Sequence, residues 1–162
     1  MKAAIIFYSF TGNTRKAASA IKDFLVQQNI EVKFLELKPE VESKSSIKQA
    51  AQSLFARKVK LSGEDMPDLS GCDYIFLGTP VWALAPAPAI RSLIQDHEAL
   101  KDKKVSLFVT YGSGLGKEKC LDKMENLLSK KANSVAARLM ISDKKVDDNE
   151  YLLDILSRDI KL

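Results

Sequence analysis

The feature that most constrains the fold is a regular alternation between short apolar runs and segments with helical periodicity. Five runs have the length and composition of buried strands: residues 3–8, 32–37, 74–77, 105–109 and 135–141. Between them, apolar side chains recur three and four positions apart, as in Ala17, Ala18, Ile21 and Leu25. That spacing places them on one face of a helix. The β-α-β-α order predicts an α/β protein, with a mostly parallel five-stranded sheet covered by helices on both faces.

Length and composition agree with one such sheet. The chain has 162 residues, 46% of them hydrophobic, which is enough for one buried core and too few for two domains of ordinary size. We therefore expect residues 1–162 to form a single domain. No apolar run reaches the roughly 18 residues that a membrane span needs, and the first one stops at Ser9 without a signal-peptide cleavage site. A cytoplasmic protein without a membrane span is expected.

The sequence contains few residues for metal or disulfide chemistry. Cys72 and Cys120 lie far apart, and His97 is the only histidine, so neither a metal site nor a structural disulfide is expected. The formal net charge is +4, and the lysines are scattered. Such a charge could attract an acidic partner, nucleic acid or the phosphates of NAD(P)H. Solvated helix faces are the favoured interpretation, and no basic stripe with interleaved aromatic residues indicates nucleic-acid binding.

The turn after the first strand has the composition of a phosphate-binding loop. The turn supplies three hydroxyls, a glycine and an amide, and it leads into the N-terminus of the predicted helix. Its residues are Ser9, Phe10, Thr11, Gly12, Asn13 and Thr14. Amide and hydroxyl donors can bind phosphate oxygens while the helix dipole offsets part of the charge, so no lysine is required. A simple helix N-cap is the alternative, although a cap needs only one hydroxyl.

The pattern Ser9-x-Thr11-Gly12-x-Thr14 resembles the phosphate loop of the flavodoxin family, and the order of the remaining elements agrees over essentially the whole chain. The resemblance implies a three-layer flavodoxin-like fold with strand order 2-1-3-4-5. It also implies FMN as the cofactor, with its phosphate bound by residues 9–14.

Two further loops face the same edge of the predicted sheet. Residues 78–88, after the third strand, carry no charge and contain the only tryptophan, which can stack on a flat ring or simply be a core residue. The resemblance implies that one side of the flavin is wrapped by Thr79, Pro80, Val81 and Trp82. After the fourth strand it implies that the flavin's pyrimidine edge is met by Tyr111, Gly112 and Ser113, although an ordinary glycine turn is an equal alternative.

Rival functions can be tested on the same residues. The glycine-rich stretch at residues 112–117 fails as a P-loop, because Tyr111 and Glu118 stand where glycine and a hydroxyl are required. A receiver domain needs an acidic pair after the first strand, and a small tyrosine phosphatase needs a cysteine in the phosphate loop. Residues 8–14 contain neither, so both functions are excluded. A serine hydrolase needs a histidine beside Ser9, whereas His97 follows a helix after the third strand.

The sequence favours an FMN-dependent oxidoreductase that takes electrons from NAD(P)H and reduces a quinone or similar flat acceptor. Electron-transfer flavodoxins are typically acidic and carry a glycine beside the loop aromatic residue, whereas this chain is basic and Ala83 follows Trp82. A one-electron shuttle serving a redox protein partner, or a non-catalytic FMN-binding module, remains the alternative. The apolar loop is also a candidate homodimer surface. Residues 38–73 are a candidate cover for the exposed flavin edge or a candidate subunit contact.

Overall fold

The computed structural model describes residues 1–38, 67–96, 98–130 and 134–161. The strands among these residues form one sheet. Its parallel strands, in spatial order, are β2 (Glu31–Glu36), β1 (Lys2–Phe7), β3 (Tyr74–Trp82), β5 (Lys104–Tyr111) and β6 (Val135–Ser142). A two-residue strand, β4 (Ala85–Pro86), pairs antiparallel with the end of β3. The predicted order 2-1-3-4-5 is confirmed, with β4 as an addition outside that path.

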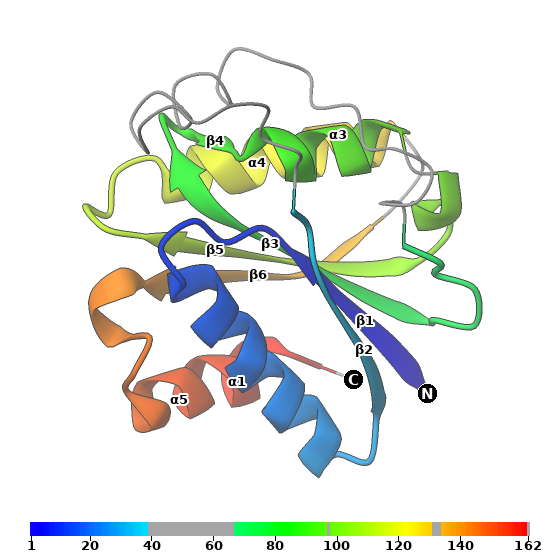
Figure 1. Ribbon diagram of the computed structural model, residues 1–162, viewed down its shortest axis with the longest axis horizontal. Coiled ribbons are helices and arrows are strands. Elements are labelled where there is room, and N and C mark those ends of the chain that lie inside the picture. Colours follow the sequence, from blue (N-terminus) through cyan, green and yellow to red (C-terminus); the bar gives the residue numbers. More distant parts are fainter. Residues whose placement is uncertain (39–66, 97, 131–133, 162) are drawn as a thin grey trace.

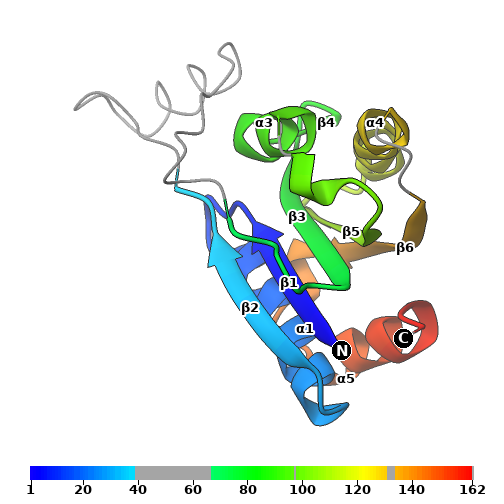
Figure 2. The ribbon, with the colours of Figure 1, turned by 90° about the vertical axis from the view of Figure 1, so that its right-hand side faces the viewer.

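Helices cover both faces of the sheet, so the structure has three layers. Figure 1 and Figure 2 show one pair of helices on each side. One face carries α1 (Asn13–Gln27) and α5 (Asn149–Asp159), and the other carries α3 (Pro88–Asp96) and α4 (Lys117–Ser129). Short 3-10 turns, η1 (Glu98–Leu100) and η2 (Asp143–Lys145), precede β5 and α5.

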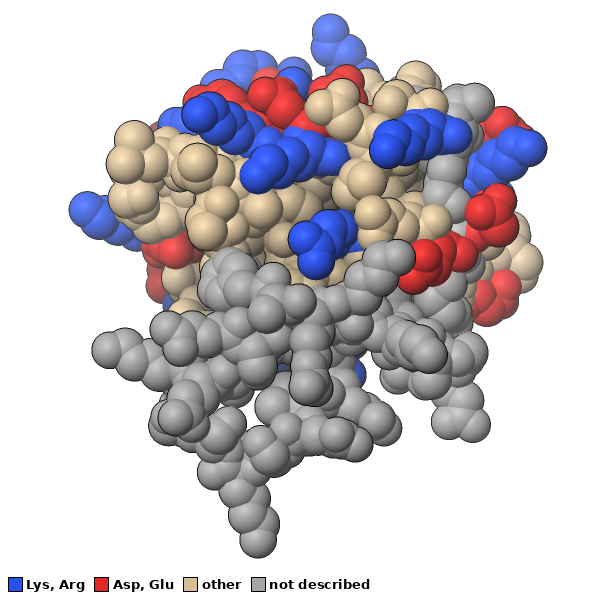
Figure 3. Space-filling model, turned by 90° about the horizontal axis from the view of Figure 1, so that it is seen from above, with Lys and Arg blue, Asp and Glu red and all other residues tan. Residues whose placement is uncertain are grey.

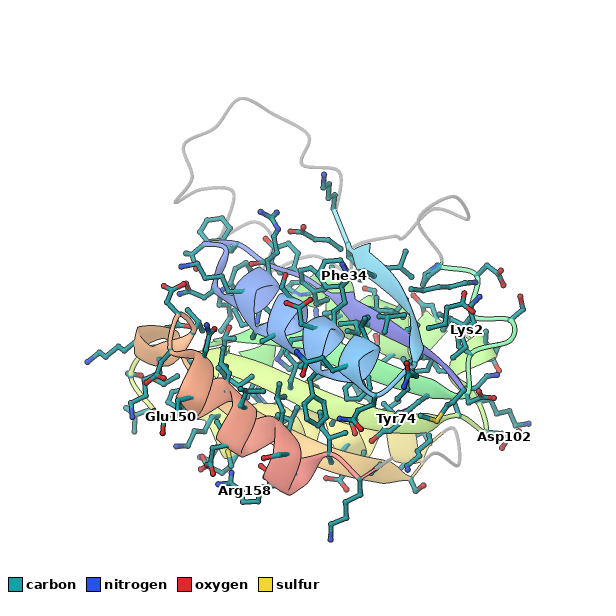
Figure 4. All side chains as sticks on the ribbon, turned by 90° about the horizontal axis from the view of Figure 1, so that it is seen from below. Lys2, Phe34, Tyr74, Asp102, Glu150 and Arg158 are labelled. Carbon is teal, nitrogen blue, oxygen red and sulfur yellow. The ribbon has the colours of Figure 1, made fainter. Side chains whose placement is uncertain are left out.

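The two cores follow from the alternation of side chains along each strand. Ala4 and Ile6 of β1 pack toward α3 and α4, whereas Ile5 and Phe7 pack toward α1 and α5. The helices meet them with the apolar stripes that the sequence predicts, and Ile21 on α1 is completely buried. Figure 4 views the α1 and α5 face, where the labelled Glu150 and Arg158 lie along the outer side of α5.

The third strand is longer than predicted. The sequence pattern ended it at residue 77, and residues 78–88 were expected to form a loop. In the structure β3 continues to Trp82, and Trp82 then pairs with Ala85 of β4 in a tight hairpin. Pro80 is tolerated because β1 ends opposite Gly78, so no β1 residue pairs with Pro80 and its missing N–H costs no bond on that side.

Some expectations cannot be compared with the structure. Most of the candidate cover at residues 38–73 lies outside the described residues, as does His97. Cys72 and Cys120 are both buried free thiols, and burial raises the pKa of Cys120 to about 12. Within the described ranges, no helix has the length and apolar character to cross a membrane.

Candidate functional site

Three connections converge at the carboxyl ends of the parallel strands, which lie at the left of Figure 1. They follow β1, β3 and β5, which are neighbours in the sheet. The chain order reverses between β1 and β3, because β1 is joined in sequence to β2 on one side and lies beside β3 on the other. Ligands of open α/β sheets bind at such a switch point. The described geometry therefore places the candidate site at this edge.

The connection after β1 is open and lined by donors. Gly12 takes a left-handed conformation, with φ of 93°, and caps α1 without a side-chain hydrogen bond among the described residues. A Cβ added to Gly12 would meet nothing within 4 Å. The Ser9 hydroxyl accepts the Arg15 N–H at 3.3 Å. The first turn of α1 contains no acidic side chain, so its N-terminal N–H groups and positive dipole end face the open side.

A buried bond ties this connection to the end of β5. The hydroxyls of Thr14 and Thr110 lie 2.8 Å apart, and each residue is only 1% exposed. The Thr14 side chain thus faces the interior, whereas Thr11 is exposed. The start of α1 is fixed against the sheet, which holds its N-terminus in one orientation.

The hairpin after β3 forms an aromatic wall. Trp82 makes edge contacts with Tyr8 and Phe10, whose ring centroids lie 5.5 and 5.6 Å from its own. Phe10 is 41% exposed, so the cluster is open at one side. The turn itself holds Ala83 and Leu84 at φ of 44° and 65°, a left-handed conformation that non-glycine residues seldom adopt. Strained backbone therefore lies directly beside Trp82.

Thr79 closes the base of this hairpin. Its hydroxyl accepts the Ala87 N–H at 2.9 Å and donates to the Pro80 carbonyl at 3.0 Å. Thr79 is completely buried. These bonds join the two ends of the segment, so Pro80, Val81 and the rest of the hairpin are held at a fixed angle to the sheet.

The connection after β5 packs against that hairpin. Gly116, at φ of 78°, begins α4, and a Cβ added there would lie 2.1 Å from Leu84 Cδ2. Tyr111 is half-buried, and the Lys117 ammonium lies 4.5 Å from the centroid of its ring. Gly112 and Ser113 are exposed. The second and third connections thus form one continuous rim.

A carboxylate completes the site. Asp143 follows β6, and its Oδ1 is buried without a hydrogen-bond partner among the described residues. Burial raises the pKa of this carboxyl, while the side-chain donors of Asn13 and Thr110 partly oppose that shift. Its Oδ2 would lie 3.6 Å from a Cβ added to Gly112. Asp143 therefore joins the first connection to the third.

Comparison with known proteins agrees with this architecture. No protein-family model matches the sequence, and no curated protein matches it. Among solved structures, a flavoprotein from Lactobacillus acidophilus in complex with FMN has a TM-score of 0.62 at 22% identity, covering 92% of this chain and 98% of its own. Oxidised flavodoxin 2 from Bacillus cereus has a TM-score of 0.61 at 19% identity, covering 98% and 99%.

The chain has a flavodoxin-like fold. A flavodoxin, WrbA-like protein from Agrobacterium tumefaciens shares it, with a TM-score of 0.58 at 14% identity over 97% of this chain and 96% of that one. The prediction made from residues 9–14 and from the order of elements is therefore confirmed at the level of the fold.

The flavodoxin-like fold brings the predicted site residues to one edge. Phe10 of the first connection touches Trp82 of the second, and Asn13 approaches Gly112 of the third through Asp143. Thr14 and Thr79 use their hydroxyls in bonds within the protein. Their contacts with a cofactor, and those of the other predicted residues, stay predictions.

Sequence reasoning missed Asp143. The strand predicted at residues 135–141 ends two positions before Asp143, so the place of this aspartate at the carboxyl edge of the sheet was available as a signal. An isolated aspartate after a strand is common in turns, however, and only the fold shows that it faces Asn13. Arg15, at the start of α1, binds Glu36 of β2 through two bonds of 2.8 and 2.7 Å.

Proposed function

We propose that the chain binds FMN at this edge of the sheet and uses it to transfer electrons from NAD(P)H to a quinone or similar flat acceptor. One observation carries the proposal: an acid-free helix N-terminus and an aromatic hairpin lie side by side at the switch point. FMN joins a phosphate to a flat ring system, so its phosphate matches the helix N-terminus and its ring matches the aromatic hairpin. The FMN complex of the Lactobacillus acidophilus flavoprotein, which has the same fold, supports this choice.

The first connection fits the phosphate. The open space at Gly12 allows an anion to approach the backbone of the first turn. Exposed Thr11 and half-buried Ser9 add hydroxyl donors at the same place. The Asp143 carboxyl, which interacts with the Asn13 and Thr110 side chains and whose pKa is raised by burial, would partly oppose an anion here when it is ionised. The donor set therefore fits a phosphate monoester.

The rim formed by the second and third connections fits the ring. Trp82 and Tyr111 supply aromatic surface, and the hairpin from Pro80 to Pro86 carries no charge. These side chains would hold the ring, exclude water from one face and leave an edge open to a substrate. When bound, FMN supplies the redox chemistry itself, accepting hydride or single electrons.

The composition of the hairpin favours a reductase over a one-electron shuttle. No glycine occurs from Thr79 to Ser92, so no glycine peptide beside Trp82 is available to turn toward the ring. The formal net charge of +4 also differs from the acidic surface typical of shuttle flavodoxins. An uncharged platform next to an open ring edge suits a flat neutral acceptor. The flavodoxins among the structures of the same fold keep the shuttle as the second candidate.

A single titration, followed by fluorescence and absorbance, tests the proposal. Trp82 is the only tryptophan, so its fluorescence reports directly on the candidate ring site during a titration with FMN. NADPH is then added without oxygen, followed by a quinone. We expect Trp82 quenching with micromolar affinity, bleaching of the flavin absorbance by NADPH and its recovery with quinone.

The other outcomes separate the alternatives. Tight FMN binding without bleaching by NADPH, together with a stable one-electron-reduced form on stepwise chemical reduction, identifies a shuttle. Tight binding with neither property identifies a binding module. Riboflavin serves as the control, because it lacks the phosphate and should bind at least tenfold more weakly if residues 9–14 hold that group. No binding of FMN at micromolar concentrations contradicts the proposal as a whole.

A further inference from the structure

A second concave feature lies outside the candidate FMN site, between β4, α3 and α4. It is a groove of about 320 Å³. Its floor is apolar and comprises Ala85, Pro86 and Leu127, and three basic side chains line it: Arg91, Lys123 and Lys130. The groove is partly open to solvent, which suits a ligand that lies across the surface.

The three basic side chains of the groove are not engaged by carboxylates of the described residues. Among the described residues, Arg91, Lys123 and Lys130 form no ion pair, whereas Lys2, Arg15, Lys16, Lys33 and Arg138 all do. The two acidic residues of α4 closest in sequence to Lys123 are engaged elsewhere, because Asp122 and Glu125 both bind Arg138 of β6, at 2.6 and 3.2 Å. Figure 3 shows basic side chains over a largely uncharged central surface, with acidic side chains nearer the edges of the view.

The spacing of these cations indicates what the groove can hold. Lys123 on α4 and Lys130, the C-cap residue of that helix, lie seven positions apart, which corresponds to about 10 Å along a helix axis. Arg91 stands on the opposite wall, on α3. A phosphate group requires donors that converge on one point, whereas these cations are spread along an apolar floor. A chain segment with carboxylates at intervals and small apolar side chains between them matches both features.

The groove begins at the hairpin of the candidate FMN site. Ala85, in its floor, pairs with Trp82, and Leu84 packs against Gly116 at the start of α4. A protein docked in the groove would therefore stand next to the proposed ring site. This closeness gives the surface a use in electron exchange if the proposed function holds, but docking itself does not depend on FMN.

We propose that the groove between α3 and α4 docks an acidic segment of a partner protein. Its cations would pair with carboxylates, and its floor would cover the apolar side chains between them. Charge complementarity carries the assignment. Because the charges are exposed, each would contribute modestly and the interaction would weaken with salt.

The test measures binding of a short fluorescein-labelled peptide of alternating glutamate and alanine by fluorescence anisotropy. An analogue with glutamine in place of glutamate has the same shape without charge. The double variant Arg91→Ala/Lys123→Ala removes one cation from each wall. The matched control, Lys22→Ala/Lys161→Ala, removes the same charge from exposed positions on α1 and near the end of the chain. Far-UV circular dichroism verifies that all variants are folded.

We expect the glutamate peptide to bind and the glutamine peptide not to bind. The groove variant should weaken binding about five- to tenfold, the control less than about twofold, and salt near 0.3 M should abolish it. Backbone amide shifts in an NMR titration should map to α3, β4 and α4. These results are expected with or without FMN, so a failure of FMN binding leaves this test intact.

Three results would overturn the assignment. Equal weakening in both variants would mean that only the overall charge matters. Displacement of the peptide from the groove by adenosine 2′,5′-bisphosphate, with tighter binding of that nucleotide, would make the groove a nucleotide site. Concentration-dependent dimerisation that protects the same amides would assign the surface to a second copy of the chain.

Discussion

The hydroxyls of Thr14 and Thr110 lie 2.8 Å apart in the interior and join the first turn of α1 to the last buried residue of β5. The two residues are 96 positions apart in the chain. This bond connects the proposed phosphate loop to the strand that leads to Tyr111. It fixes two of the three connections of the site relative to each other before any ligand is bound.

Replacing Thr110 by valine should destabilise the protein. The change keeps the shape of the side chain but leaves the buried Thr14 hydroxyl without its partner and removes a donor to Asp143, at a cost of about 1–2 kcal/mol in the free energy of unfolding. Urea denaturation monitored by circular dichroism measures it. Thr11→Val makes the same chemical change at an exposed position and should stay within about 0.5 kcal/mol of the wild type. Equal losses in both variants would contradict the structural role of the bond.

Thr11 and Gly12 should matter for FMN in a different way. Thr11→Val removes an exposed donor and should weaken FMN binding about tenfold without a comparable loss of stability. Gly12→Ala introduces a Cβ at φ of 93°. This change should weaken FMN binding and also lower the free energy of unfolding by about 1 kcal/mol. Gly12→Asn is the control, because asparagine tolerates this conformation better than alanine. FMN titration followed by Trp82 fluorescence separates the two effects.

Asp143 should make stability depend on pH. Burial raises its pKa above the ordinary value of 3.8, so the folded state holds this proton at a pH where the unfolded chain has released it. Its contribution to the free energy of unfolding therefore falls as pH rises through the interval between the unfolded and folded pKa values. Asp143→Asn should remove that slope and raise the stability at neutral pH. Urea denaturation at several pH values between about 3 and 7 measures it.

The matched variant for this experiment is Asp23→Asn, which neutralises an exposed carboxylate on α1. This variant should keep the fall in the free energy of unfolding that Asp143 causes as pH rises above 3.8. Asp143→Asn should also strengthen FMN binding about two- to threefold, because it removes a negative charge close to the phosphate loop. If FMN instead binds more weakly to this variant, the carboxylate positions Asn13 by accepting its hydrogen bond, and charge repulsion is not the dominant effect.

The sequence predicted the fold because its signals are local and repeated. The apolar run at residues 3–8 and the stripe containing Ile21 and Leu25 each specify one element, and parallel strands joined by helices leave few ways to order a sheet. The phosphate loop was predicted for the same reason, since Ser9, Thr11 and Gly12 follow one strand directly. The segment 39–66 lies outside the described residues, so the role of residues 38–73 as a cover stays a prediction.

The features that were not predicted depend on contacts distant in the sequence. The extension of β3 to Trp82 requires β1 to end early, which no property of residues 78–82 shows. The position of Asp143 beside Asn13 depends on how β6 and α1 meet the same edge. The left-handed turn at Ala83 and Leu84 contradicts local preference, so only the packing of the hairpin against α4 accounts for it.

That packing leads to a prediction about Gly116. A Cβ at this position would lie 2.1 Å from Leu84 Cδ2, far inside van der Waals contact, and the residue has φ of 78°. Gly116→Ala should therefore lower the free energy of unfolding by about 2–3 kcal/mol. Because the clash displaces the turn that carries Trp82, FMN binding should weaken by about tenfold as well.

A double-mutant cycle separates the two causes. Leu84→Ala removes the side chain that the new Cβ would meet, so Gly116→Ala should cost less in that background. The steric part, about 1–2 kcal/mol, should be recovered together with most of the FMN affinity, whereas the backbone strain at φ of 78° should remain. Urea denaturation and FMN titration of all four proteins measure the coupling. If the two substitutions are additive, the turn and the start of α4 do not act on each other, and the rim around the proposed ring site is not one mechanical unit.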